Sequence, residues 1–153
     1  MKTYATTPKD ITRSWHLIDV EDKILGRIST DMAKKLIGKN KPYFTSHLDC
    51  GDYVVVINSD KVQVTGRKAK QKTYYHHSNY PSGLKSITFE KQLAKDSRKI
   101  IINAVKSMLP KNKLRSLRLN RLKIFKDANH IYQDKFKTKS KPAAVKEPVK
   151  KES

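Results

Sequence analysis

The chain has 153 residues, with 34 lysines and arginines against 14 aspartates and glutamates, and its formal net charge of +20 excludes an acidic or neutral soluble module. Its length fits one domain and argues against a two-domain enzyme. It has one cysteine, no apolar run of about 18 residues and no signal-like N-terminal stretch, so we expect a soluble intracellular protein without disulfides or a cysteine-based zinc site.

Two short apolar runs separated by an amphipathic segment predict the first part of the fold. Trp15–Val20 and Tyr53–Ile57 have the length and composition of strands. Five successive apolar residues in the second run favour a strand covered on both faces, as in a parallel sheet. Between the runs, apolar residues recur at helical spacing from Leu25 to Leu36, and Gly38 is placed to end the helix. This order predicts a βαβ unit with a right-handed crossover.

The second half of the chain predicts a strand, two helices and a final short strand, over Lys72–His76, Thr88–Lys95, Arg98–Leu109 and Leu122–Phe125. Asp96 or Ser97 can cap the longer helix, and Pro110 follows its end. From Gln133 onward the chain has seven lysines but one aromatic residue, too little apolar surface to offset the entropy of ordering. We therefore expect a folded domain over residues 1–132 and a lysine-rich tail over residues 133–153 that is disordered when free.

The positive charge is concentrated in the middle of the chain. Residues 1–60 carry nine basic and eight acidic side chains, whereas residues 61–126 carry eighteen basic side chains against Glu90 and Asp96 alone, a net charge of +16. Crowding these charges into a compact state costs self-repulsion, which a fitting polyanion would remove. A lysine-rich surface kept only for solubility normally intersperses both signs. The pattern therefore favours nucleic-acid binding by the folded domain.

Basic and aromatic residues are interleaved after the central strand. Four cations follow a predicted turn at Gly66 and precede the run YYHHSNY: Arg67, Lys68, Lys70 and Lys72. Such cations reach phosphate oxygens, while tyrosine and histidine rings stack on unpaired bases or bond to sugars, as in RNA recognition. Strand alternation leaves a second interpretation open, in which Tyr74 and His76 point into the core.

A second cationic row follows Pro110. Its members are spaced by four, three and three residues: Lys111, Arg115, Arg118 and Arg121. A helix here would align them along one side, and such a row would match a phosphate backbone.

The strongest sign of an enzyme is the segment before the central strand, which contains His47, Asp49 and Asp52. An α/β enzyme can place catalytic groups there, but short carboxylates also favour the turns that lead into strands. The chain lacks a His-Glu-x-x-His pattern and a complete P-loop, so we predict neither a metal site nor a nucleotide-phosphate loop. We interpret Cys50 as a small packed residue.

Longer segments of the chain resemble one known family. Four of them occur in the order found in the bacterial form of the thirteenth large-subunit ribosomal protein, over roughly Lys2–His130: LGRISTDMAKKLIGKNK, YFTSHLDCGDYVVVINSDKVQVTGRK, KTYYHHS, and VKSMLP followed by LKIF. The resemblance implies a three-layer α/β/α fold around a four-stranded parallel sheet. It also implies a protein of the cytoplasmic ribosome that binds large-subunit ribosomal RNA and neighbouring ribosomal proteins and acts early in subunit assembly. It implies no catalysis, cofactor, membrane or small-molecule substrate.

The family's motifs can be placed on this chain residue by residue. Its basic loop falls on the four cations after Gly66, and its signature helix end falls on Val105, Lys106, Met108, Leu109 and Pro110. Ser107 and Arg115 stand where the family usually has glycine, and Ser46 stands where it commonly has proline. The predicted RNA-binding set is Arg67, Lys68, Lys70, Lys72, His76, His77, Lys106, Lys111, Lys113, Arg115, Arg118, Arg121 and Lys123.

Three functions therefore stay open from the sequence. A structural ribosomal RNA-binding protein would bind RNA with a strong salt dependence. A nucleotide- or RNA-processing enzyme would lose turnover when His47, Asp49 and Asp52 are replaced. A DNA-compacting protein would bind duplex DNA as tightly as ribosomal RNA. The resemblance favours the first.

Overall fold

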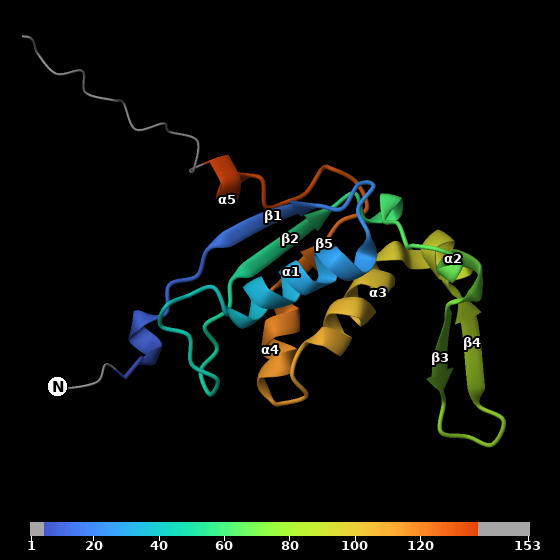
Figure 1. The fold of residues 1–153 in the computed structure, drawn as a ribbon, viewed down its shortest axis with the longest axis horizontal. Helices are drawn as coiled ribbons and strands as arrows, with labels where there is room; N and C mark the ends of the chain where they lie inside the picture. The colour runs from blue at the N-terminus through green and yellow to red at the C-terminus, as the bar shows by residue number, and fades with distance from the viewer. Residues whose placement is uncertain (1–4, 138–153) are drawn as a thin grey trace, which may run out of the picture.

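The computed structural model describes residues 5–137, which form a mixed α/β fold (Figure 1). In chain order its helices and strands are β1 (Trp15–Asp19), α1 (Leu25–Ile37), β2 (Tyr53–Ile57), α2 (Lys68–Gln71), β3 (Thr73–His77), β4 (Leu84–Thr88), α3 (Phe89–Met108), α4 (Leu114–Asn120), β5 (Leu122–Ile124) and α5 (Asp134–Lys137), with 3₁₀ turns at Pro8–Asp10 and Ser59–Lys61. No helix among these residues is both long enough and apolar enough to span a membrane.

The central sheet has three parallel strands in the order β1-β2-β5. Trp15 lies opposite Tyr53 at the start of the first pair, and Val54 lies opposite Leu122 in the second. The strands predicted at both ends of the βαβ unit and at Leu122–Phe125 are confirmed to within one residue. The three central valines of β2 are fully buried, as expected for a strand covered on both faces.

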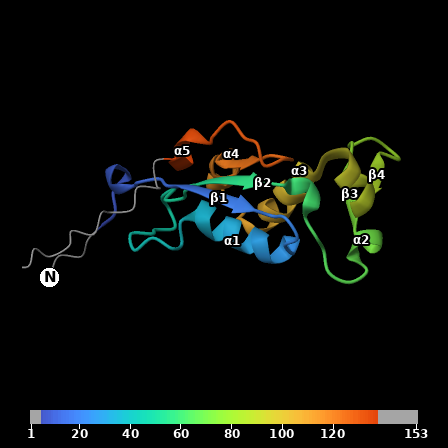
Figure 2. The ribbon, with the colours of Figure 1, turned by 90° about the horizontal axis from the view of Figure 1, so that it is seen from above.

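The prediction of a fourth parallel strand in the central sheet is wrong. β3 forms where a strand was predicted, but it pairs antiparallel with β4 in a separate hairpin, with Thr73 opposite Thr88 and His77 opposite Leu84. A strand inside a parallel sheet needs apolar side chains on both faces, whereas β3 ends in three exposed residues. The hairpin instead projects at the end of the molecule away from the N-terminal segment (Figure 1 and Figure 2).

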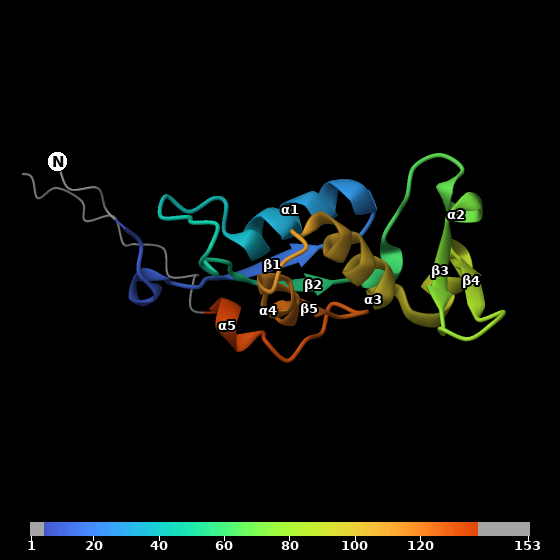
Figure 3. The same ribbon diagram turned by 90° about the horizontal axis from the view of Figure 1, so that it is seen from below.

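Helices α1 and α3 pack together over one face of the sheet, and the main apolar core lies beneath them (Figure 3). The predicted stripe of α1 is buried there, including Met32 and Leu36. Gly38 ends α1 in the left-handed region, with φ of 84°, where a side chain would be strained, and its N–H donates to the Lys34 carbonyl at 3.0 Å.

The two helices predicted on either side of Asp96 are the two parts of α3. Asp96 has an extended backbone, with φ of −161° and ψ of 98°, and its carboxylate accepts the Arg98 N–H at 3.2 Å. This is the predicted cap of the second part. The hydroxyl of Ser97 donates to Asp60 and lies 2.7 Å from that of Ser59, so the break is tied to the Ser59–Lys61 turn.

On the other face of the sheet, α5 lies opposite α1 (Figure 3). Aromatic side chains pack together beside β1 and α5. Trp15 stacks on Tyr53, with ring centroids 4.3 Å apart, and its ring lies 5.1 Å from Tyr132 and 6.5 Å from Phe136. This C-terminal segment, with one short helix, therefore lies against the face of the sheet opposite α1 (Figure 3). Within the predicted tail, Asp134–Lys137 form α5, and the Phe136 ring contacts Trp15 of β1. The rest of the predicted tail, residues 138–153, lies outside the described residues.

Candidate nucleic-acid interface

Two adjoining hollows run along the C-terminal half of α3, and we call them together the basic channel. The first, the hairpin groove, is lined by residues that include Lys72, Tyr74, Tyr75, Asn103, Lys106 and Arg115. The second reaches the start of α1 and is lined by residues that include Leu25, Gly26, Lys68, Lys72, Ser107 and Met108. The hollows share Lys72 and Ser107, so they meet along α3.

The fold brings four predicted cations from separate elements into this channel: Lys68, Lys72, Lys106 and Arg115. Lys72 is held at the junction of α2 and β3, because its N–H donates to the Lys68 carbonyl at 2.9 Å and its carbonyl accepts the Phe89 N–H at 2.8 Å. Arg115 Nε donates to the Lys106 carbonyl at 3.0 Å, which fixes the guanidinium beside the end of α3. Of the described residues that line the channel, none is acidic, so its charge is uncompensated.

Other members of the predicted set surround the channel without lining it. Six of them are exposed: Arg67, Lys70, His76, His77, Lys111 and Lys113. Arg67 and Lys70 flank a separate hollow at Gly66, and His77 Nδ1 accepts the Asn79 N–H at 2.9 Å in the hairpin turn. Lys123 is half-buried on β5, opposite Val55.

Arg118 and Arg121 do not reach the surface. Their side chains are 2% and 8% exposed, and both guanidinium groups approach Asp49. Arg121 Nη2 lies 2.6 Å from Oδ1 and Nη1 donates to Oδ2, while Arg118 Nε lies 3.7 Å from Oδ1. The four cations therefore do not form the predicted row along one side of a helix that could face a phosphate backbone. Lys111 precedes α4, and Arg118 and Arg121 face Asp49 in the interior.

The loop before β2, which the sequence offered as a possible catalytic site, has a structural role. Asp49 neutralises the buried arginines, and Asp52 is tied to β1, while His47 is exposed. A Cβ on Gly51 would lie 1.8 Å from the Leu36 carbonyl oxygen, so the loop packs directly on the end of α1. The two carboxylates have structural partners, but these are distant side chains and the Ser14 N–H rather than the turn of their own loop, as had been expected. Cys50 is buried as expected. Among residues 5–137, no group of three His, Cys, Asp or Glu side chains could hold a metal ion.

Asp52 receives three hydrogen bonds, from the Ser14 N–H at 2.9 Å, from Lys41 Nζ at 2.5 Å, and in the contact with His16 Nε2 at 2.9 Å. Burial by itself would raise the pKa of Asp52, but these hydrogen bonds outweigh it and hold the pKa below its ordinary value. The carboxylate therefore stabilises the fold above its unfolded pKa, and this contribution is lost as the pH falls through the lower folded pKa.

Replacing Asp52 with asparagine is expected to flatten the acid loss of stability. The free energy of unfolding of the unchanged chain should fall as the pH drops below roughly 4, the ordinary aspartate pKa. The variant should be less stable at neutral pH and lose less on acidification, as measured by urea unfolding from about pH 7 to 2.5. Asp127→Asn, at an exposed site, is the matched control. If the free energy of unfolding depends on pH in the same way in the two variants, Asp52 is not the source of the acid-sensitive stability.

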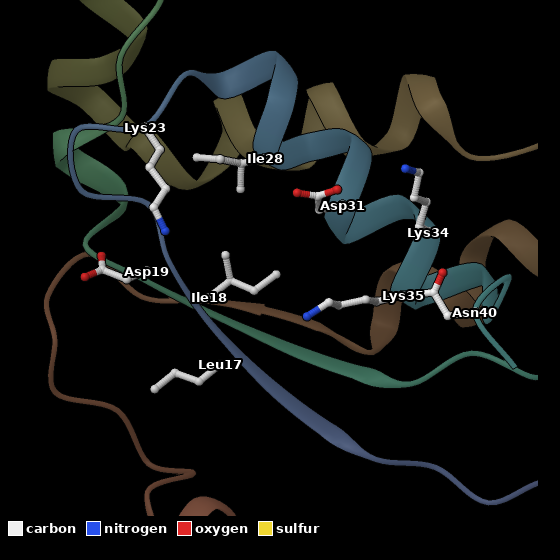
Figure 4. Close-up of a pocket in the computed structure, with 9 residues that line it drawn as sticks. All are labelled: Leu17, Ile18, Asp19, Lys23, Ile28, Asp31, Lys34, Lys35 and Asn40. Carbon is white, nitrogen blue, oxygen red and sulfur yellow. The ribbon is translucent and has the colours of Figure 1, made fainter.

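A hollow between β1 and α1 offers a weaker site for a polyanion (Figure 4). It is lined by Lys23, Lys34 and Lys35, but also by Asp19 and Asp31 (Figure 4). The pKa of Asp19 is lowered by hydrogen bonds from the Glu21 backbone and from Asn58, so its charge is secured at neutral pH. Mixed signs make this hollow a poorer match for phosphate than the basic channel.

Sequence reasoning did not place Asn103 or Ser107 in the predicted set, although both line the hairpin groove. The available signal was helical spacing, since Asn103, Lys106 and Ser107 lie at i, i+3 and i+4 and so share one face of α3. Tyr74 and Tyr75 were considered as stacking residues but not included. Tyr74 also packs against the core, which confirms the alternative interpretation for this ring, whereas His76 is exposed.

Comparison with known proteins places the chain in a family. The family model described as ribosomal protein L13 matches residues 13–131. The chain is 50% identical over 130 residues to the large ribosomal subunit protein uL13 of Pseudomonas paraeruginosa, and the match covers 85% of this chain and 92% of that protein. The proteins of the same name from Pseudomonas aeruginosa and Shewanella baltica are 49% and 50% identical over the same shares. This chain belongs to the ribosomal protein L13 family.

Proposed function

We propose that the chain binds large-subunit ribosomal RNA through the basic channel and the exposed cations around it, and that it supports early assembly of the large subunit. As a ribosomal protein of a structural family it is not an enzyme. We place it in the cytoplasmic ribosome, where neighbouring large-subunit proteins are its further partners. The observation that carries the proposal is the convergence of four cations from α2, α3 and α4 on one channel without a lining acid.

RNA binding of this kind works by charge and shape. Contacts to phosphate fix the position of the protein, and the rigid surface between them holds RNA segments at a set distance. Neutralising the residue 61–126 charges also removes their mutual repulsion, so binding and folding support each other. The proposed contacts keep the predicted set except its two buried arginines: Arg67, Lys68, Lys70, Lys72, His76, His77, Lys106, Lys111, Lys113, Arg115 and Lys123.

The affinity for large-subunit ribosomal RNA is expected to fall steeply with salt. If about 6 to 10 phosphates are neutralised, the association constant should drop by about three to five decades between roughly 50 and 200 mM salt. Filter binding with duplex DNA as a competitor measures both the slope and the preference for RNA. An affinity that hardly changes over this range, or equal affinity for the DNA, would refute the proposal.

Sedimentation tests the assembly role separately. Large subunits and their precursors from a lysate, separated on a gradient, should contain this chain in stoichiometric amount, including the early precursors. A chain found only in complete subunits would contradict early action, and its absence from both peaks would contradict the whole proposal.

A further inference from the structure

The hairpin groove has exposed aromatic surface that the fold itself does not use. Tyr75 is 68% exposed on β3, although burying such a ring would stabilise the fold. The hydroxyl of Tyr74 is buried and has no hydrogen-bond partner. Burial raises the pKa of Tyr74, so the phenol keeps its proton at neutral pH and remains a hydrogen-bond donor. The groove therefore presents the free ring face of Tyr75, whereas the buried Tyr74 hydroxyl is not accessible to a ligand in it.

Three cations lie in the same groove, and we call them the cationic trio: Lys72, Lys106 and Arg115. The Lys72 ammonium is 5.4 Å from the Tyr74 ring centroid, so it is held above that ring. Asn103 lines the groove beside the trio, and its amide can both donate and accept hydrogen bonds. A ligand that suits all these groups combines a flat ring, a polar edge and a nearby anion.

We propose that the hairpin groove holds one unpaired nucleotide of RNA, with its base against Tyr75 and its phosphate on the cationic trio. The inference rests on the proposed function and adds that the groove takes single-stranded rather than duplex RNA. Bases inside a duplex are stacked on each other and cannot offer a face to a protein ring, whereas a base in a loop or bulge can. An acidic peptide would satisfy the trio but would leave the face of Tyr75 unused.

The test uses the full chain and two probes, a ten-nucleotide oligouridine and an RNA duplex of ten base pairs. Tyr75→Ala should weaken oligouridine binding about 5- to 100-fold, the loss typical of one base–aromatic stack, and leave duplex binding nearly unchanged. Tyr75→Trp should retain binding, because it keeps a ring face. Tyr80→Ala is the matched control, since Tyr80 is 75% exposed in the same hairpin but does not line the groove. Both side chains are exposed, so neither change should unfold the chain, which circular dichroism verifies.

The outcomes separate this inference from the proposed function. Equal effects of Tyr75→Ala and Tyr80→Ala, with salt-dependent binding of ribosomal RNA intact, would overturn the nucleotide site alone. If the unchanged chain does not bind ribosomal RNA at all, the proposed function is overturned as well. A decaglutamate peptide that competes for the groove as well as oligouridine would show a protein partner instead.

Discussion

Replacing Asp49 with asparagine is expected to lower the free energy of unfolding by about 3–5 kcal/mol. Asp49 is the carboxylate that both Arg118 and Arg121 approach, and Arg13 Nη2 lies 3.9 Å from it as well. A neutral amide would leave two buried guanidinium groups without a counter-charge and close to each other. Folded domains have a net stability of only about 5–15 kcal/mol, so urea unfolding should show a large shift of the midpoint.

Asp31→Asn is the matched control, because Asp31 is exposed on α1 and the same change there should cost at most about 0.5 kcal/mol. A second variant isolates the charge effect: adding Arg118→Met to Asp49→Asn should recover part of the loss, since it removes one unpaired buried cation. Equal stabilities of the Asp49 and Asp31 variants would show that Asp49 does not compensate the arginines.

The buried arginines mark where sequence reasoning failed, and the reason is sequence separation. Asp49 and Arg121 are 72 positions apart in the sequence. The residues of α4 and its neighbours give no sign that a carboxylate lies against the inner side of this helix. Helical spacing identified the row of cations but not the direction it faces. These partners explain why the loop resembled a catalytic cluster: Asp49 neutralises arginines and Asp52 pairs with Lys41 and His16, and in the sequence such structural carboxylates cannot be told from catalytic ones.

The elements that were predicted well carry their signal locally. The strands of the βαβ unit and helix α1 have buried faces that repeat within a few residues, and Gly38 ends the helix through its own backbone. The hairpin was missed because Leu84–Thr88 has little apolar periodicity, so no partner was predicted for the strand at β3. Phe136 was assigned to the tail because its packing partner, Trp15, is distant in the chain.

In the candidate site, too, some features could be predicted from the sequence and others depend on contacts between distant residues. Residue type and charge density identified Lys68, Lys72 and Arg115 as RNA-contacting candidates, because a surplus of cations can be counted in a sequence, and the family resemblance added Lys106. Their convergence on one channel depends on how α2 and α4 each pack against α3, which is a tertiary property. The number of basic residues in the sequence therefore indicated which cations could bind RNA, but not which of them line the basic channel and which lie elsewhere on the surface.

Replacing these four channel cations with glutamine is expected to weaken binding to large-subunit ribosomal RNA by roughly a hundred- to a thousand-fold near 150 mM salt. Each cation that neutralises a phosphate releases condensed counterions, so its loss lowers the affinity and also makes the affinity less sensitive to salt. The slope of log affinity against log salt should become shallower by about 3. Filter binding at several salt concentrations measures both quantities.

The control must carry the same change in net charge elsewhere on the surface. Lys9, Lys23, Lys34 and Lys39 are exposed and belong to the first sixty residues, where basic and acidic side chains nearly balance. If the channel binds RNA, replacing these four with glutamine should reduce the affinity far less, because distant exposed charges act only through a screened field. Equal losses in the two quadruple variants would mean that net charge alone draws the RNA and that the channel has no special part in binding. A loss confined to the channel variant, at unchanged unfolding free energy, would place the phosphate contacts in the basic channel along α3.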